Sequence, residues 1–112
     1  MEAIAFVKSI RERVIESDHT DYQNMLTNTD DATDPTWKEI LSLFKNLTKE
    51  QKESFLNFLR LIQVNTVSHI FGILDGSTYL DESRETFVLK TESSEDAING
   101  DLQDLFLEME EE

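Results

Sequence analysis

The chain has 112 residues, a length that fits one domain spanning residues 1–112, and 38% of them are hydrophobic, which is enough for a folded core. It contains no cysteine, which excludes disulfide frameworks, thiolate zinc sites and thiol nucleophiles. A net charge of −14 repels the phosphates of nucleic acids and the headgroups of anionic lipids, so we expect no direct binding to nucleic acid or to a membrane.

The first predicted element is an amphipathic helix over residues 3–16. Its apolar residues Ile4, Val7, Ile10 and Val14 recur at steps of three and four, the spacing of one helix face, and Phe6 and Ile15 widen this face. The same N-terminal sequence lacks the basic start and long apolar run of a signal peptide, so we expect a cytoplasmic protein. The next segment, SDHTDYQNMLTNTDDATDP, predicts a short helix followed by an acidic loop.

Two helices are predicted in the middle of the chain. Asp34 is a good N-cap for the first, and Pro35 occupies its first turn, where a missing N–H loses no intrahelical hydrogen bond. Thr48 and Gln51 have the spacing of a capping box for the second helix, which covers residues 48–74 and is apolar on nearly all sides in its C-terminal half. Such a helix belongs at the centre of a bundle, where its surface is covered by its own chain or by a second copy in a homodimer.

The sequence pattern changes after Gly76, a natural residue to end the long helix. The segments STYL and TFVLK are short and β-prone, and they predict a β-hairpin near residues 78–90. The final segment, NGDLQDLFLEMEEE, predicts a helix with Asp101 as its N-cap and an acidic outer face. The predicted fold class is therefore mainly α, a small bundle of four to five helices around a central apolar helix (48–74), with a short hairpin near 78–90.

Candidate groups for catalysis are few. The two histidines, His19 and His69, accompany neither a glycine-flanked serine nor a thiol that could act as a nucleophile. We interpret His69 as a half-buried group that hydrogen-bonds across helices, and His19 as a neighbour of a helix cap. The acidic segments do not follow the order of a calcium loop, and three glycines cannot form a phosphate-binding loop. We expect a protein that is not an enzyme, with no catalytic residue, no metal site and no cofactor.

The acidic residues are concentrated in two regions. Residues 17–39 contain six acidic residues and one basic residue, residues 40–71 contain two acidic and four basic residues, and residues 72–112 contain thirteen acidic and two basic residues. This distribution attracts a basic protein, and aromatic side chains beside acids are suitable anchors for one. The candidate partner-binding residues are Asp30, Asp31, Asp34, Trp37, Tyr79, Asp101, Asp104 and Glu108.

Three classes of function are open at this point. The favoured class is a non-enzymatic binding protein that engages a basic protein partner. The second is a DNA mimic whose carboxylates imitate phosphates and so inhibit a nucleic-acid-binding protein. The third is a small metal-dependent enzyme, which would require His69 to lie among carboxylates in an open pocket. Acidic residues that serve only to keep the protein soluble are the alternative to all three.

The stretch from DPTWKEILSLFKNLT to FLNFLRLIQVNTVSHIFGILDGS resembles the central half of small, uncharacterised, acidic helical proteins of bacteria, some of which are similar to immunity proteins encoded beside toxins. The resemblance covers fewer than half of the residues. It implies a small helical domain that holds a basic toxin through charge and a few aromatic side chains. A toxin-neutralising immunity protein is therefore the most concrete form of the binding hypothesis, although no individual binding residue is carried over.

Overall fold

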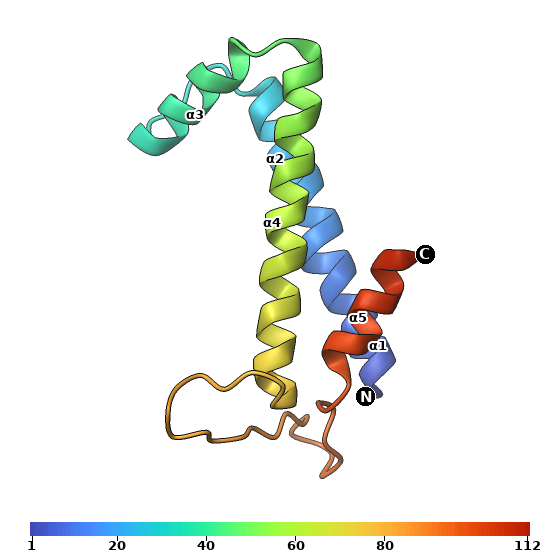
Figure 1. Cartoon of the computed structure of the whole chain (residues 1–112). Coiled ribbons are helices and arrows are strands. Elements are labelled where there is room, and N and C mark those ends of the chain that lie inside the picture. Colours follow the sequence, from blue (N-terminus) through green and yellow to red (C-terminus); the bar gives the residue numbers. More distant parts are fainter.

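The computed structural model describes all 112 residues and is mainly helical, as the sequence predicts. Its elements are α1 (Ala3–Ile10), the π-helical segment η1 (Arg11–Ser17), α2 (Asp18–Asn28), α3 (Pro35–Lys45), α4 (Lys49–Asp75) and α5 (Leu102–Glu111). The first three follow one another without a break and form one rod beside α4, and α5 packs against both near the end of α4 (Figure 1). The molecule is elongated, with extents of 50 × 32 × 27 Å.

The ends of α3 and α4 lie where the sequence predicts them. The Asp34 carboxylate accepts two hydrogen bonds from backbone N–H groups in the first turn of α3, and Pro35 is the first residue of that helix. Thr48 and Gln51 form the predicted capping box, with both reciprocal hydrogen bonds present. From there α4 continues unbroken for 27 residues, or about 40 Å, and Gly76 ends it in the left-handed conformation with a φ of 84°.

The rod contains a feature that the sequence pattern did not reveal, the π-helical segment η1. The predicted apolar face includes Val7, Val14 and Ile15, and the structure buries Val7 and Ile15 completely but leaves Val14 exposed. A π-helical turn takes more residues than an α-helical turn, so the residue that returns to the core face comes one position later in the chain. The same segment joins α1 to α2, which corrects the expectation of a helix over residues 3–16 followed by a separate short one.

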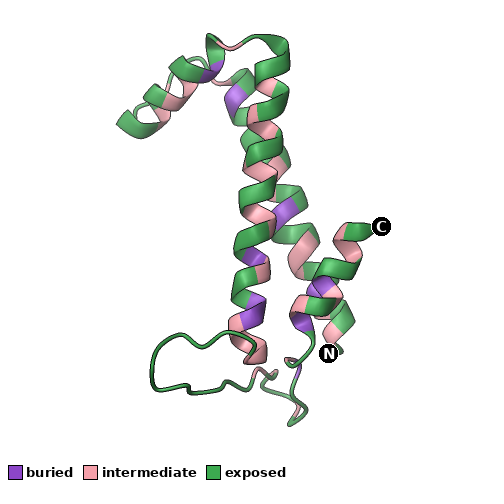
Figure 2. Ribbon diagram, viewed as in Figure 1, coloured by how far each residue is buried: buried purple, intermediate pink, exposed green.

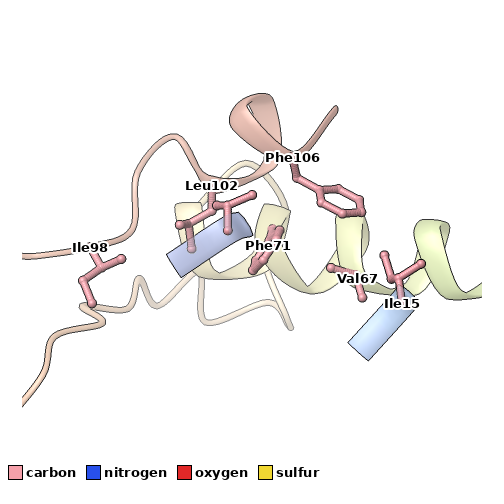
Figure 3. Packing of buried hydrophobic residues seen from close by; sticks show 7 residues of the cluster. Ile15, Val67, Phe71, Ile98, Leu102 and Phe106 are labelled. Carbon is pink, nitrogen blue, oxygen red and sulfur yellow. The ribbon is translucent and has the colours of Figure 1, made fainter. Parts of the chain in front are cut away.

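The main core lies where the rod, the C-terminal half of α4 and α5 meet. Seven buried side chains form it: Val7, Ile15, Val67, Phe71, Ile98, Leu102 and Phe106 (Figure 3). The Phe71 ring contacts the rings of Phe6 and Phe106, with centroids 6.2 and 5.6 Å away. Each large side chain buried in this way contributes about 1.5–3 kcal/mol to stability. This end of the molecule therefore holds most of the apolar packing, because only Leu26 and Phe44 are buried at the other end.

The predicted hairpin near residues 78–90 is absent. Residues 76–101 contain no strand and form a long connection between α4 and α5. The Asn99 side chain organises the base of this connection, since its amide donates hydrogen bonds to the carbonyls of Leu74 and Phe87 and its oxygen accepts one from the N–H of Leu89. One side chain thus satisfies backbone groups that the pairing of two strands would otherwise satisfy.

The arrangement is consistent with a helical bundle, but α4 is not enclosed at its centre. The rod and α5 cover the face of α4 that carries Val67 and Phe71, whereas Phe58, Ile62 and other apolar residues of α4 remain exposed (Figure 2). The reason is that α3 points away from α4 along most of its length and the connection after α4 adds no helix (Figure 1). One face of α4 is therefore without a partner in the chain.

Candidate interaction surfaces

The candidates Asp30, Asp31, Asp34 and Trp37 lie at the connection between α2 and α3. Asp34 is engaged in the cap of α3, where its carboxylate accepts a hydrogen bond from the backbone N–H of Trp37 at 3.1 Å. The Trp37 ring stacks on Tyr22 of α2, with centroids 6.2 Å apart and an angle of 28° between the ring planes. Trp37 therefore ties α3 to α2, and it offers a partner only part of its surface.

Asp30 and Asp31 line a groove of about 770 Å³ between α2, α3 and the start of α4. Four lysines also line this groove, which is here called the lysine groove: Lys38, Lys45, Lys49 and Lys52. None of the four forms an ion pair within the chain, and the Lys52 ammonium lies 5.3 Å from the centre of the Phe44 ring. This end of the molecule has mixed charge, so it is not the purely acidic surface expected from the residues just before Trp37.

The candidates Asp101, Asp104 and Glu108 lie on one side of α5 and are exposed; they form the acidic face of α5. Asp101 occupies the N-cap position, but its side chain makes no capping hydrogen bond. The cap comes instead from Asp75 at the end of α4, whose carboxylate accepts a hydrogen bond from the backbone N–H of Gln103 at 2.8 Å. The predicted N-cap position of Asp101 is therefore confirmed, but the capping carboxylate comes from Asp75, and the Asp101 carboxylate stays free at the surface.

Four charged side chains fix the other end of α5. Glu110 pairs with Arg11 at 2.6 Å and with Arg60 at 3.3 Å, and Arg60 also pairs with Glu16 at 2.9 Å. The hydrogen bond to the Glu110 carboxylate raises the pKa of Arg11 above its ordinary value. Because these residues belong to η1, α4 and α5, the cluster joins three helices and holds α5 in place.

Tyr79 lies in the connection that follows α4 and is exposed. The guanidinium of Arg84 lies 5.9 Å from the centre of its ring, so Tyr79 already has a cation beside it within the chain. Asp81, two residues further on, accepts hydrogen bonds from the hydroxyl and the backbone N–H of Ser83. These hydrogen bonds lower the pKa of Asp81 below its ordinary value.

The eight candidate residues do not form one surface. The group at the α2–α3 connection lies at the end where α4 starts. The acidic face of α5 lies beside the C-terminal half of α4, because α5 runs from its cap at Asp75 to the ion pair between Glu110 and Arg60. Tyr79 belongs to neither group. The structure therefore forms two separate groups, one at the α2–α3 connection and one of Asp101, Asp104 and Glu108, which share one side of a single helix.

The histidines differ from their predicted roles. His69 is exposed on α4 rather than half-buried. The His19 ring nitrogen Nδ1 lies 3.3 Å from Oε1 of Gln63, which links α2 to α4. No group of three or more His, Cys, Asp or Glu side chains lies close enough together to hold a metal ion. None of the helices combines the length and the apolar character that crossing a membrane requires.

One further surface was missing from the sequence-based candidates. It is the uncovered side of α4, here called the bare face, and it consists of Phe58, Leu61, Ile62, Asn65, His69 and Ile70. Its sequence signal is the stretch from Leu61 to Leu74, which contains no Asp, Glu, Lys or Arg in a chain with a net charge of −14. Such a stretch is typical of an enclosed helix, and it is equally typical of an interface.

The chain therefore presents three surfaces of different chemistry: the lysine groove, the acidic face of α5 and the bare face of α4. Comparison with protein-family models, with curated proteins and with solved structures found no match to this chain.

Proposed function

We propose that the chain is a non-enzymatic binding protein that engages a basic protein through the acidic face of α5. The observation that carries this proposal is a surplus of free carboxylates in the last third of the chain. Residues 72–112 contain thirteen acidic residues, and hydrogen bonds or ion pairs engage four of them, Asp75, Asp81, Glu95 and Glu110. The remaining nine are exposed.

The acidic face also has a rigid support. Asp75 caps the start of α5, and Arg11 and Arg60 hold Glu110 near its end. Charges on a rigid element keep their positions when a partner approaches, so less conformational entropy is lost on binding. Complementary charges raise the association rate and favour partners of the right sign. These properties suit a docking surface for a cationic protein.

A toxin-neutralising immunity protein is the most concrete form of this proposal. Its support is the combination of small size, a net charge of −14, a mainly helical fold and the resemblance of the central stretch to immunity-like bacterial proteins. In this form the partner is a toxin with a cationic surface, and α5 neutralises it by covering that surface.

The two other classes have less support. A DNA mimic needs carboxylates spaced along one elongated face, as phosphates are along a duplex. Here the lysine groove and the stretch of α4 from Leu61 to Leu74, which has no Asp, Glu, Lys or Arg, separate the acidic regions along the chain. A metal-dependent enzyme would require His69 among carboxylates, and His69 lies on the bare face with Ile62 and Ile70 instead.

The test compares the wild-type chain with two variants that each lose three negative charges. The first carries Asp101→Asn, Asp104→Asn and Glu108→Gln on the acidic face. The control carries Glu12→Gln, Asp21→Asn and Glu39→Gln, at exposed residues that form no ion pair. Each protein is immobilised, exposed to an extract of the source cell at low salt and eluted with a salt gradient.

We expect the wild-type chain and the control variant to retain a basic protein that salt releases, because screening weakens contacts between charged surfaces. The acidic-face variant is expected to bind the purified partner at least about tenfold more weakly. Equal binding by the two variants would contradict the proposal, and so would retention that does not depend on salt.

A further inference from the structure

We propose that the bare face of α4 binds a second copy of this chain, with the two α4 helices packed antiparallel. Helical spacing places Ile62 opposite Phe71, so α4 has apolar residues on two opposite faces and only one of them is covered. The large apolar side chains of the bare face, Phe58, Leu61, Ile62 and Ile70, are each 48–58% exposed. This proposal is independent of the basic partner, because it uses a different helix.

The surface area of the chain favours an occupant as large as a second copy. The accessible surface is 8268 Å², whereas an average monomer of 13.0 kDa exposes about 6,300 Å². The excess is about 1,900 Å² per chain, and obligate homodimers bury roughly 2,000–5,000 Å² over both chains. The radius of gyration agrees, since it is 17.6 Å against about 13 Å for a compact domain of this length.

The charge of the bare face favours a second copy over a basic protein. In a contact about a twofold axis, each residue near the axis meets its own counterpart, so any charge there meets a like charge. The stretch from Leu61 to Leu74 avoids this repulsion because it contains no Asp, Glu, Lys or Arg. A cationic partner would gain no attraction from this surface, whereas an identical apolar surface is complementary to it.

The two ends of the molecule favour the antiparallel orientation. The lysine groove lies where α4 starts, the acidic connection of residues 76–101 lies where α4 finishes, and in Figure 1 α3 and this connection project to the same side of α4. An antiparallel contact about an axis between Asn65 and His69 places the lysine groove of each copy toward the end of the second copy that carries the acidic connection. A parallel arrangement would bring lysines beside lysines and acids beside acids.

Sedimentation equilibrium at micromolar protein concentration tests the proposal. We expect the wild-type chain to have twice the mass of the 13.0 kDa monomer. Ile62→Asp places a charge inside the contact, so the dissociation constant of the dimer should rise at least about hundredfold. Ile4→Asp is the matched control, because it makes the same change at a similarly exposed isoleucine on α1, and it should leave the dimer intact.

Asn65→Glu is a second variant that removes no apolar side chain. Because Asn65 is exposed, this variant should keep the helical circular dichroism spectrum of the wild-type chain. It should sediment as a monomer, because the two introduced carboxylates would face each other near the twofold axis. A monomeric wild-type chain would overturn the proposal, and so would dimers of both Ile62→Asp and Asn65→Glu. A monomer that still captures a basic protein would overturn only the dimer, and a dimer that captures none would overturn only the proposed function.

Discussion

The C-terminal half of α4 has two apolar faces that differ in what covers them. Val67 and Phe71 on one face are buried against the rod and α5, whereas Ile62 and Ile70 on the bare face are about half exposed. Both faces belong to one stretch without Asp, Glu, Lys or Arg. An apolar surface all around a helix therefore does not show that the chain itself covers every side of it, because the chain covers only one of these two faces.

The largest difference between the two faces is expected from truncation of one large side chain on each. Phe71→Ala opens a cavity among the core aromatic rings and should lower the free energy of unfolding by about 3–5 kcal/mol. Ile62→Ala, measured where the chain is monomeric, should change it by less than about 0.5 kcal/mol. Urea unfolding measures both values, and equal losses would show that the bare face is packed within the monomer.

A smaller difference is expected between the two aspartates at the start of α5. Asp75→Ala removes the carboxylate that caps α5 and should lower the free energy of unfolding by about 0.5–2 kcal/mol. Asp101→Ala removes an exposed carboxylate that makes no capping hydrogen bond, so its effect should stay within about 0.5 kcal/mol. If Asp101→Ala proved the more destabilising in the same urea experiment, the helix would be capped locally and not from α4.

The smallest effect is expected in the connection that follows α4. Hydrogen bonds from Ser83 lower the pKa of Asp81, so this local turn is favoured above the ordinary aspartate pKa and is lost as the pH falls through the lowered value. Ser83→Ala removes the hydroxyl donor and should raise the pKa of Asp81. A pH titration monitored by NMR measures this pKa, and an unchanged midpoint would exclude the Ser83 hydroxyl as a cause of the lowered pKa.

The sequence predicts the helix ends well because each depends on neighbours in the chain. Asp34 and Pro35 start α3, Thr48 with Gln51 starts α4, and Gly76 ends it, and all of these signals act within about one helical turn. The acidic face of α5 was equally predictable from the sequence, because the spacing of its three acidic residues places them on one side of a helix.

The features that the sequence did not predict depend on contacts between residues that are distant in the sequence. Asp75 supplies the capping carboxylate of α5 from more than twenty residues away although Asp101 holds the N-cap position, and Asn99 organises the connection where a hairpin was expected. The π-helical segment, which leaves Val14 exposed, also had no local signal in the sequence. The lysine groove could not be foreseen either, because it forms only when α3 and the start of α4 lie beside α2.

Intermolecular distances between spin labels test the proposed packing of the bare face most directly, and the absence of native cysteine makes single-cysteine variants straightforward to label. In an antiparallel dimer, labels at Asn65→Cys should lie within about 20 Å of each other, because this position is near the axis, whereas labels at Lys49→Cys should lie about 50 Å apart. Short distances at both positions would indicate a parallel dimer. The absence of any intermolecular distance at Asn65→Cys would contradict the account.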